Sequence, residues 1–299
     1  MTNPTDGFLD HLRRRDAADG TISNYRNTLA HFWPWFSQTT RQPPDPAYVT
    51  PLDVKQYRDA LKPLYKPGTI NRRLANLSTY FKWCVVNSLA ADDPTEHVRR
   101  VSEQKAPRWL SRPEVYRVLR HVRQAVQIAQ VRRLAPSLVI STRTMAIVVL
   151  LLATGLRVSE LCDLSLGDIL LGERTGRVVI RCGKGNKRRE IPLNADARRA
   201  LREWLLIRQS NTRYVFVSDS GRMSRQLVQW HLSQLGQEIG VHLSPHLLRH
   251  TFGKSLVDAG ESLERVAQLM GHSDVNTTAI YTMASQVDLQ RAVDKISWG

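Results

Sequence analysis

Six residues in the second half of the chain combine side-chain types that could carry out chemistry on a phosphodiester. They are Arg157, Lys184, His246, Arg249, His272 and Tyr281. Arginine forks can hold an anionic phosphate, a tyrosine hydroxyl can attack phosphorus, and lysine or histidine can transfer protons. No acidic cluster with metal-ligand spacing belongs to this set. The set as a whole therefore suggests chemistry on a phosphodiester.

The first arginine stands in the segment Ala-Thr-Gly-Leu-Arg-Val-Ser-Glu-Leu, residues 153–161. An apolar helix is expected to end at Gly155, which leaves Arg157 at the mouth of the next turn. Glu160 follows three residues later and can hold the guanidinium of Arg157 in one orientation. Taken alone, the segment would fit better with an ion pair on a helix surface.

The lysine lies in a basic hairpin. Residues 178–182 and 188–193 are predicted to be strands, joined by a turn in which glycines flank Lys184. Glycines let the backbone approach a ligand closely, and a hairpin of this width can enter a DNA groove. The basic residues after the turn are candidates for phosphate contacts: Lys187, Arg188 and Arg189. Solvated charges on a surface turn are the alternative.

The second arginine is expected in the first turn of a helix. Ser244 can cap this helix, and Pro245 suits its first position. His246 and Arg249 then lie three residues apart on one face, where the helix N-terminus also favours an anion. His250 is interpreted as a structural histidine with its hydrogen bonds satisfied.

The last segment runs from Gly271 to Tyr281. Gly271 is expected to close a helix in the left-handed conformation, which places His272 at the corner. Tyr281 follows nine residues later, on what should be a new short helix. A DNA-binding helix-turn-helix, in which Tyr281 only packs, is the alternative for this segment alone.

The overall charge favours nucleic acid as the partner. Among 299 residues, 43 lysines and arginines oppose 27 aspartates and glutamates, a net charge of +16. Such a surplus attracts polyanions, whereas mixed signs would serve solubility better. Residues 107–299 carry +12 of this charge and residues 1–106 carry +4.

The cysteines and the apolar runs indicate a cytoplasmic protein. Cys84, Cys162 and Cys182 are few and far apart, which fits a reducing compartment better than a disulfide framework. The longest apolar run, residues 147–152, is too short to cross a bilayer, and no signal-peptide pattern precedes it. We expect no association with a membrane.

The first 90 residues are predicted to be helical. One helix should begin at a cap formed by Thr21 or Ser23, and another should cover residues 67–88. The outer face of the second helix carries three basic residues: Arg72, Arg73 and Lys82. This face is interpreted as a DNA-binding surface, and simple solvation of its charges is the alternative.

Periodicity and prolines divide the chain into two domains. Residues 1–90 form a helical domain, residues 91–108 a linker and residues 109–299 a second domain. In the second domain, helices are expected at residues 113–135, 141–153, 195–209, 224–239, 245–259 and 261–270. The predicted fold is therefore mainly α, with a small antiparallel β-sheet in the second, mixed α+β domain.

The four segments together, in this order, resemble the tyrosine recombinase or phage integrase family, which includes the Xer recombinases and transposon-borne relatives. The matching motifs are Ala-Thr-Gly-Leu-Arg-Val-Ser-Glu-Leu, Gly-Lys-Gly-Asn-Lys, His-Leu-Leu-Arg-His and Gly-His-Ser…Thr-Thr…Ile-Tyr. The resemblance covers the whole chain, because the family places a helical, SAM-like core-binding domain before the catalytic domain. It implies site-specific recombination of DNA through a 3′-phosphotyrosyl intermediate, without metal or ATP.

The resemblance also implies a role for each of the six residues. Arg157 and Arg249 would bind the non-bridging oxygens of the scissile phosphate, and Tyr281 would be the nucleophile. Lys184 would protonate the departing 5′-oxygen, and His272 would hydrogen-bond the phosphate. His246 is the candidate for the base that takes the proton of Tyr281, with Glu160 supporting Arg157.

The family further implies double-stranded DNA sites as substrate and a homo-tetramer on two paired sites, with a related recombinase as a further partner in some systems. The chain departs from compact Xer-like members by an extra arginine-rich stretch near residues 121–136. Eighteen residues follow Tyr281. In the family such a tail docks on the neighbouring protomer, and packing on its own domain is the alternative.

Two other functions fit parts of this pattern. A type IB topoisomerase shares the catalytic set and relaxes DNA without pairing two sites, but the small size and the core-binding domain favour recombination. A DNA-binding accessory protein without catalysis would have no need of Tyr281. The complete set of six residues therefore favours an enzyme.

Overall fold

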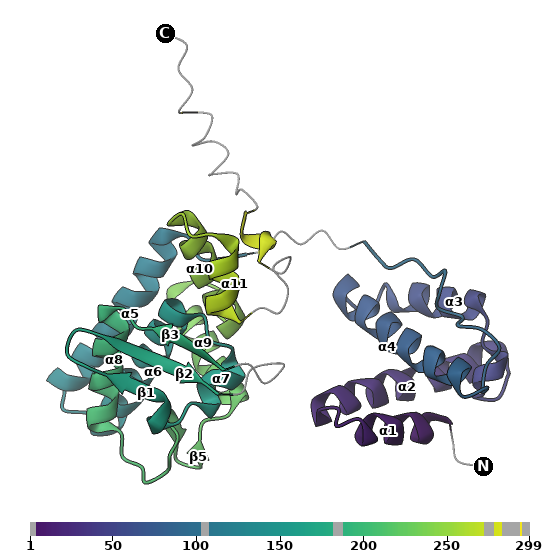
Figure 1. Cartoon of the computed structure of the whole chain (residues 1–299), viewed down its shortest axis with the longest axis horizontal. Coiled ribbons are helices and arrows are strands. Elements are labelled where there is room, and N and C mark those ends of the chain that lie inside the picture. Colours follow the sequence, from purple (N-terminus) through teal and green to yellow (C-terminus); the bar gives the residue numbers. More distant parts are fainter. Residues whose placement is uncertain (1–3, 103–107, 182–187, 272–277, 283–293, 295–299) are drawn as a thin grey trace. The chain divides into compact units, whose positions relative to one another are not determined.

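The computed structural model describes residues 4–102, 108–181, 188–271, 278–282 and 294. The chain forms two compact units, Met1–Lys105 and Ala106–Gly299 (Figure 1). Helices dominate both units, and the described strands form two small antiparallel sheets in the second unit. The predicted fold class is confirmed. The expected turn with Lys184 and Lys187 and the expected corner with His272 lie outside the described residues.

The first unit is a helical bundle around an aromatic core. Its elements are α1 (Pro4–Arg14), α2 (Asp19–Thr40), the 3₁₀ turn η1 (Pro46–Tyr48), α3 (Pro51–Leu61) and α4 (Pro67–Val86). Phe8, Phe32, Tyr57 and Phe81 are fully buried, and the Phe32 and Tyr57 rings meet edge to face at 5.0 Å. Aromatic pairs in this arrangement add to the stabilisation that burial provides.

Helix α2 begins earlier than the sequence predicts. Ala18 is its N-cap, so Thr21 and Ser23 lie inside the helix and the expected cap is wrong. Asp19 in the first turn compensates, because a carboxylate stabilises the positive end of the helix dipole. Helix α3 begins at a reciprocal capping box formed by Thr50 and Asp53.

Residues 91–101, predicted as part of the linker, lie against the first unit. The Asn71 side chain donates to the carbonyl of Val101 at 2.8 Å and accepts from its backbone N–H at 2.8 Å. Arg58 on α3 donates to the carbonyl of Arg99 at 3.0 Å. These bonds continue the first unit beyond residue 90.

The second unit is built around one apolar helix, α6 (Ala135–Thr154). The other helical elements of this unit are α5 (Arg112–Val131), α7 (Val158–Asp163), η2 (Leu166–Asp168), α8 (Ala195–Ile207), α9 (Arg225–Ile239), α10 (Pro245–Asp258), α11 (Leu263–Met270) and η4 (Ala279–Thr282), of which α5, α8 and α10 pack on α6. By length and composition α6 could cross a membrane, but residues 145–151 are buried in the core of this unit. Their burial fits a core helix.

The boundary between α5 and α6 differs from the prediction. Helix α5 ends at Val131, and α6 begins at Ala135, six residues before the expected start. Arg133 has a left-handed φ of 52°, and Pro136 lies in the first turn of α6. Proline in the first turn of a helix needs no partner for an N–H group and therefore favours a helix start at this place. The helix thus begins before the uniformly apolar residues from which its start was predicted.

The main sheet has the order β1 (Ile169–Leu171), β2 (Gly176–Ile180), β3 (Arg189–Pro192), all antiparallel. A second ribbon joins β4 (Val217–Ser218) to β5 (Gly221–Arg222). The predicted β2–β3 pairing is confirmed, with Ile180 opposite Arg189. Val178 and Ile191 face the core, so the hairpin is anchored and the position of Arg189 is fixed.

Candidate active site

Three chain turns bring the site together, and glycine shapes two of them. Gly155 ends α6 in the left-handed conformation at φ 59°, where an added Cβ would collide with the Phe252 ring. Gly271 ends α11 in the same conformation at φ 65°. Both glycine caps agree with the prediction. Ser244 caps α10 as expected, accepting a bond from Leu247 N–H at 3.2 Å.

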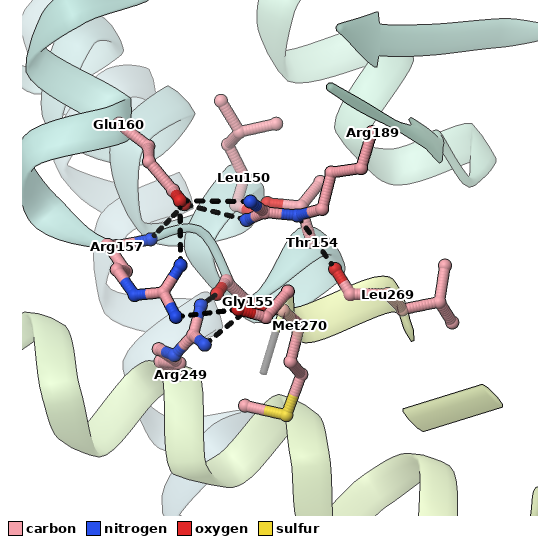
Figure 2. Close-up of polar contacts among 10 residues, drawn as sticks. Leu150, Thr154, Gly155, Arg157, Glu160, Arg189, Arg249, Leu269 and Met270 are labelled. Atoms are coloured by element: carbon pink, nitrogen blue, oxygen red, sulfur yellow. Dashed lines mark hydrogen bonds and ion pairs between the residues drawn. The ribbon is translucent and has the colours of Figure 1, made fainter. Parts of the chain in front are cut away.

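Arg157 is the N-cap of α7, and its guanidinium is held from two sides (Figure 2). Nη1 donates to Oε1 of Glu160 at 2.9 Å, and Nη2 donates to the carbonyl of Gly271 at 2.8 Å. The backbone N–H of Arg157 also donates to Glu160 at 2.8 Å. The contact predicted between Arg157 and Glu160 is present. The side chain remains 29% exposed, so a phosphate can reach it.

Arg249 is buried beside it, with 5% of its surface exposed. Its Nη1 donates to the carbonyl of Gly155, and its Nη2 donates to the carbonyl of Met270 at 2.7 Å. Burial, followed by the repulsion of Arg157, lowers the pKa of Arg249 to about 10. The side chain still carries its charge at neutral pH, because that value is well above 7. The two arginines therefore place two positive charges at the end of α11.

Arg189 was expected to contact DNA phosphates, but in the structure its side chain points into the site. Its side chain is only 10% exposed and forms a fork on the Glu160 carboxylate, with bonds of 2.9 Å and 2.7 Å. Its Nε donates to the carbonyl of Leu269 at 3.2 Å. Arg189 occupies the first position of β3, where its side chain is directed into the site. The run of basic residues in the hairpin sequence did not predict this orientation.

Glu160 is the common partner of Arg157 and Arg189 (Figure 2). Burial by itself raises the pKa of this carboxyl, but the hydrogen bonds from Arg189 and from Arg157 outweigh it and lower the pKa. The carboxylate is therefore ionised at neutral pH. A buried carboxylate with these partners can fix the positions of both arginines.

Tyr281 is buried in the second unit, with 1% of its surface exposed. Its hydroxyl shares a hydrogen bond of 2.9 Å with Nδ1 of His250. Its ring lies on α10 so closely that a Cβ added to Gly253 would stand 2.7 Å from two ring carbons. Burial raises the pKa of Tyr281 to about 12, although Arg249 acts against this rise. In this conformation the phenol is protonated and is covered by protein.

The two histidines of α10 differ in their contacts with Tyr281. His246, the expected partner of Tyr281, is exposed in the first turn of the helix. His250, interpreted as a structural histidine with its hydrogen bonds satisfied, shares a hydrogen bond with the Tyr281 hydroxyl. A step of four residues along α10 separates them. One helical turn therefore decides which histidine meets the phenol, and the motif alone could not choose between them.

The basic residues expected to bind DNA have different surroundings. Arg72 and Lys82 on α4 are exposed, and Arg188 is 68% exposed beside Glu190. Arg73 is partly buried: its guanidinium lies 4.6 Å from the centre of the Tyr65 ring and donates to the Tyr57 hydroxyl at 3.3 Å. Lys184, Lys187 and His272 lie outside the described residues. In the part of the chain that is described, no group of histidine, cysteine and acidic residues could hold a metal ion.

Gly253→Ala tests the packing of Tyr281. The new methyl group would also stand 2.8 Å from the Met270 sulfur, so both neighbours must move. We expect the free energy of unfolding to fall by about 1–3 kcal/mol, as for other overpacked cores. Urea denaturation measures this loss. Gly20→Ala, where nothing lies within 4 Å, is the control; an equal effect at both sites would contradict the packing.

Stability should also fall in mild acid. Burial, then His246 and Arg249, lowers the pKa of His250, while burial and then Arg143 lower the pKa of His231. Below about pH 6.5 the unfolded chain therefore binds more protons than the folded protein. Stability is present above that pH and is lost as the pH falls through the folded pKa values. Thermal melts from neutral pH to pH 5 measure this, and a rising melting temperature would contradict it.

Comparison with known proteins follows the same division of the chain. Residues 5–90 match the model described as phage integrase, N-terminal SAM-like domain, and residues 121–287 match the phage integrase family. The second match covers more than half of the sequence. This chain belongs to the phage integrase family. Membership agrees with the order of the four segments and with the placement of two arginines, a histidine and a tyrosine in one region.

Individual relatives cover nearly the whole chain. The tyrosine recombinase XerC of Azotobacter vinelandii is 32% identical over 94% of this chain and 91% of its own length. The XerC of Corynebacterium efficiens is 34% identical over 98% and 90%. The crystal structure of XerH site-specific recombinase bound to a palindromic difH substrate superposes with a TM-score of 0.76 at 19% identity, over 94% of this chain and 81% of that one. This last likeness shows a shared fold.

Proposed function

We propose that this family member is a site-specific DNA recombinase that cuts and rejoins strands through a 3′-phosphotyrosyl intermediate. The observation that carries the proposal is the convergence of Arg157 and Arg249 on the end of α11, with Tyr281 packed on the helix that bears Arg249. Two cationic forks beside a tyrosine suit a phosphodiester. The XerC relatives, named tyrosine recombinases, support the same activity.

The arginines supply the electrostatic part of the reaction. Each guanidinium uses part of its donors on Glu160 or on backbone carbonyls, and further N–H groups remain for a phosphate. Bound non-bridging oxygens would gain negative charge as phosphorus becomes five-coordinate. Preorganised donors stabilise that charge more in the transition state than in the ground state.

Tyr281 supplies the nucleophile. Its oxygen forms a bond to phosphorus, the bond from phosphorus to O5′ breaks, and the 5′-oxygen leaves with a proton from Lys184. A 5′-hydroxyl of another strand then attacks the phosphotyrosine, and the tyrosine leaves again. Two phosphoester bonds are exchanged with no net hydrolysis, so no ATP is consumed. His272 would hydrogen-bond the phosphate during both steps.

The proton of Tyr281 needs an acceptor. We retain His246 as a candidate, but the contact in the structure favours His250, whose Nδ1 lies 2.9 Å from the hydroxyl. The lowered pKa of His250 keeps its ring neutral at pH 7, as an acceptor must be. Because Tyr281 is covered in this conformation, it must become exposed before it can meet DNA.

The partners follow from the same proposal. Double-stranded recombination sites are the substrate, with Arg72, Lys82 and Arg188 as exposed residues available to their phosphates. A tetramer of this chain on two paired sites, alone or with a related recombinase, would place four tyrosines at four strands. A protein with this substrate is expected in the cytoplasm, with the DNA.

A plasmid assay separates recombination from its alternatives. DNA selected by binding to the purified protein is cloned as two copies on one supercoiled plasmid. A recombinase inverts or excises the segment between the copies, so the restriction pattern changes. Relaxation with an unchanged pattern would favour the type IB topoisomerase, and binding without either change would favour an accessory protein.

A further inference from the structure

Three arginines bind three consecutive carbonyls at the end of α11. Arg189 donates to Leu269, Arg249 to Met270 and Arg157 to Gly271 (Figure 2). Carbonyls in the last turn of a helix have no partner within the helix, and cations there also interact favourably with the helix dipole. The end of α11 is thus tied to α7, β3 and α10 by three separate side chains.

Arg189 packs directly against the end of α11. Its guanidinium lies so close to Gly271 that an added Cβ would stand 2.7 Å from Nη1. The left-handed conformation of Gly271 and the absence of a side chain there therefore leave space for the arginine. Moving Arg189 would open a gap under the turn that precedes His272 and Tyr281 in sequence.

Arg189 also sets the position of Glu160. Its fork binds both carboxylate oxygens, and those oxygens accept the side-chain and backbone bonds of Arg157. Glu160 is buried, with 5% of its side chain exposed, so water cannot replace a lost partner easily. Among the lowering influences on the pKa of Glu160, the bond from Arg189 is the largest. Arg157 therefore depends on Arg189 through a shared carboxylate.

We propose that Arg189 is a positioning residue of the strand-cleavage site, acting through Glu160 on Arg157 and through Leu269 on the end of α11. The inference rests on the proposed function and deepens it. The described hydrogen bonds of the Arg189 side chain go to Glu160 and to the carbonyl of Leu269. Its loss should lower the rate of cleavage on bound DNA and leave the affinity for DNA unchanged.

The first experiment measures cleavage of nicked half-sites by Arg189→Met under single-turnover conditions with saturating protein. A misplaced catalytic group commonly costs about 100-fold in rate, and we expect a loss of that order. Arg189→Lys should lose less, since its ammonium group retains the charge and can still donate to Glu160. Arg177→Ala is the matched control, because Arg177 is an exposed arginine of the same sheet that pairs with Glu190 at the surface. Cleavage by Arg189→Met at the wild-type rate would overturn the proposal.

A second substrate distinguishes positioning from a general loss of folded protein. A half-site with a methylphosphonate at the scissile position lacks the charge that Arg157 stabilises. If Arg189 acts through Arg157, the penalty of Arg189→Met should largely disappear on this neutral substrate. An equal penalty on both substrates would contradict the proposal. In the double variant Glu160→Gln with Arg189→Met, both changes interrupt the same connection to Arg157, so the two losses of rate should not add.

Hydrogen exchange keeps this inference separate from the proposed function. In the protein without DNA, Arg189→Met should speed amide exchange in α11, and Arg177→Ala should not. Unchanged exchange would show that Arg189 does not hold α11. If wild-type protein formed no covalent complex while exchange changed as expected, the recombinase proposal would fail and the structural role of Arg189 would stand alone.

Discussion

Replacing Tyr281 by phenylalanine is expected to abolish covalent attachment of the protein to DNA, with a loss of at least ~10⁴-fold in cleavage. The hydroxyl is the atom that forms the bond to phosphorus, and phenylalanine offers no substitute. The phenylalanine ring can still pack against Gly253 as the tyrosine ring does, so the fold should persist. Detergent-stable protein–DNA bands on nicked half-sites measure the loss, and gel-shift titration measures the retained binding.

The His250 contact supplies a control for this result. The Tyr281 change leaves His250 Nδ1 without the phenol at 2.9 Å, so a modest loss of stability is expected. His250→Gln removes the same contact from the other side and keeps the nucleophile. It should slow cleavage and still give some covalent product. Covalent product from Tyr281→Phe would show that another residue attacks the DNA.

Arg249→Lys should have the second largest effect. Lysine has a single ammonium group, which cannot reach the carbonyls of Gly155 and Met270 while it also binds a phosphate oxygen as a fork. Loss of a preorganised donor to transition-state charge commonly costs about 10²–10³-fold in rate. Because the site is buried, we also expect a lower melting temperature, from the unpaired carbonyls.

The matched control for this change is Arg265→Lys. Arg265 lies on α11, is 73% exposed and pairs with Glu261 at 3.1 Å, so the same substitution removes only a surface interaction. Exposed pairs of this kind contribute little to stability. Both cleavage and melting temperature should match the wild type. Equal losses in the two variants would mean that the buried bonds of Arg249 have no special part in the reaction.

The sequence was sufficient for the parts of the fold that local signals determine. Gly155, Gly271 and Ser244 end or start helices where their types predict, because each satisfies a terminus that few other residues can. The hairpin alternation placed β2 opposite β3. The pairing of Arg157 with Glu160 also followed from a spacing of three residues. These are all short-range relations.

The remaining features depend on contacts distant in sequence. Arg189 and Glu160 are separated by 29 positions, and Arg189 and Leu269 by 80. A basic run on a hairpin gives no sign that its third member turns inward. Likewise, the motif around Arg249 contains two histidines, and only the packing of η4 on α10 shows which one contacts Tyr281. These contacts are determined by tertiary packing and do not follow from the residue types in the motifs.

The most direct test of the central claim is to identify the residue that becomes attached to DNA. Covalent complexes from nicked half-sites are digested with nuclease and trypsin, and the nucleotide-bearing peptide is sequenced by mass spectrometry. Cleavage after Arg265 and Arg291 releases residues 266–291, in which Tyr281 is the one tyrosine. A 3′-nucleotide adduct at Tyr281 is the result we predict. An adduct on another peptide, such as the one with Tyr214, would contradict the assignment of the nucleophile and with it the proposed active site.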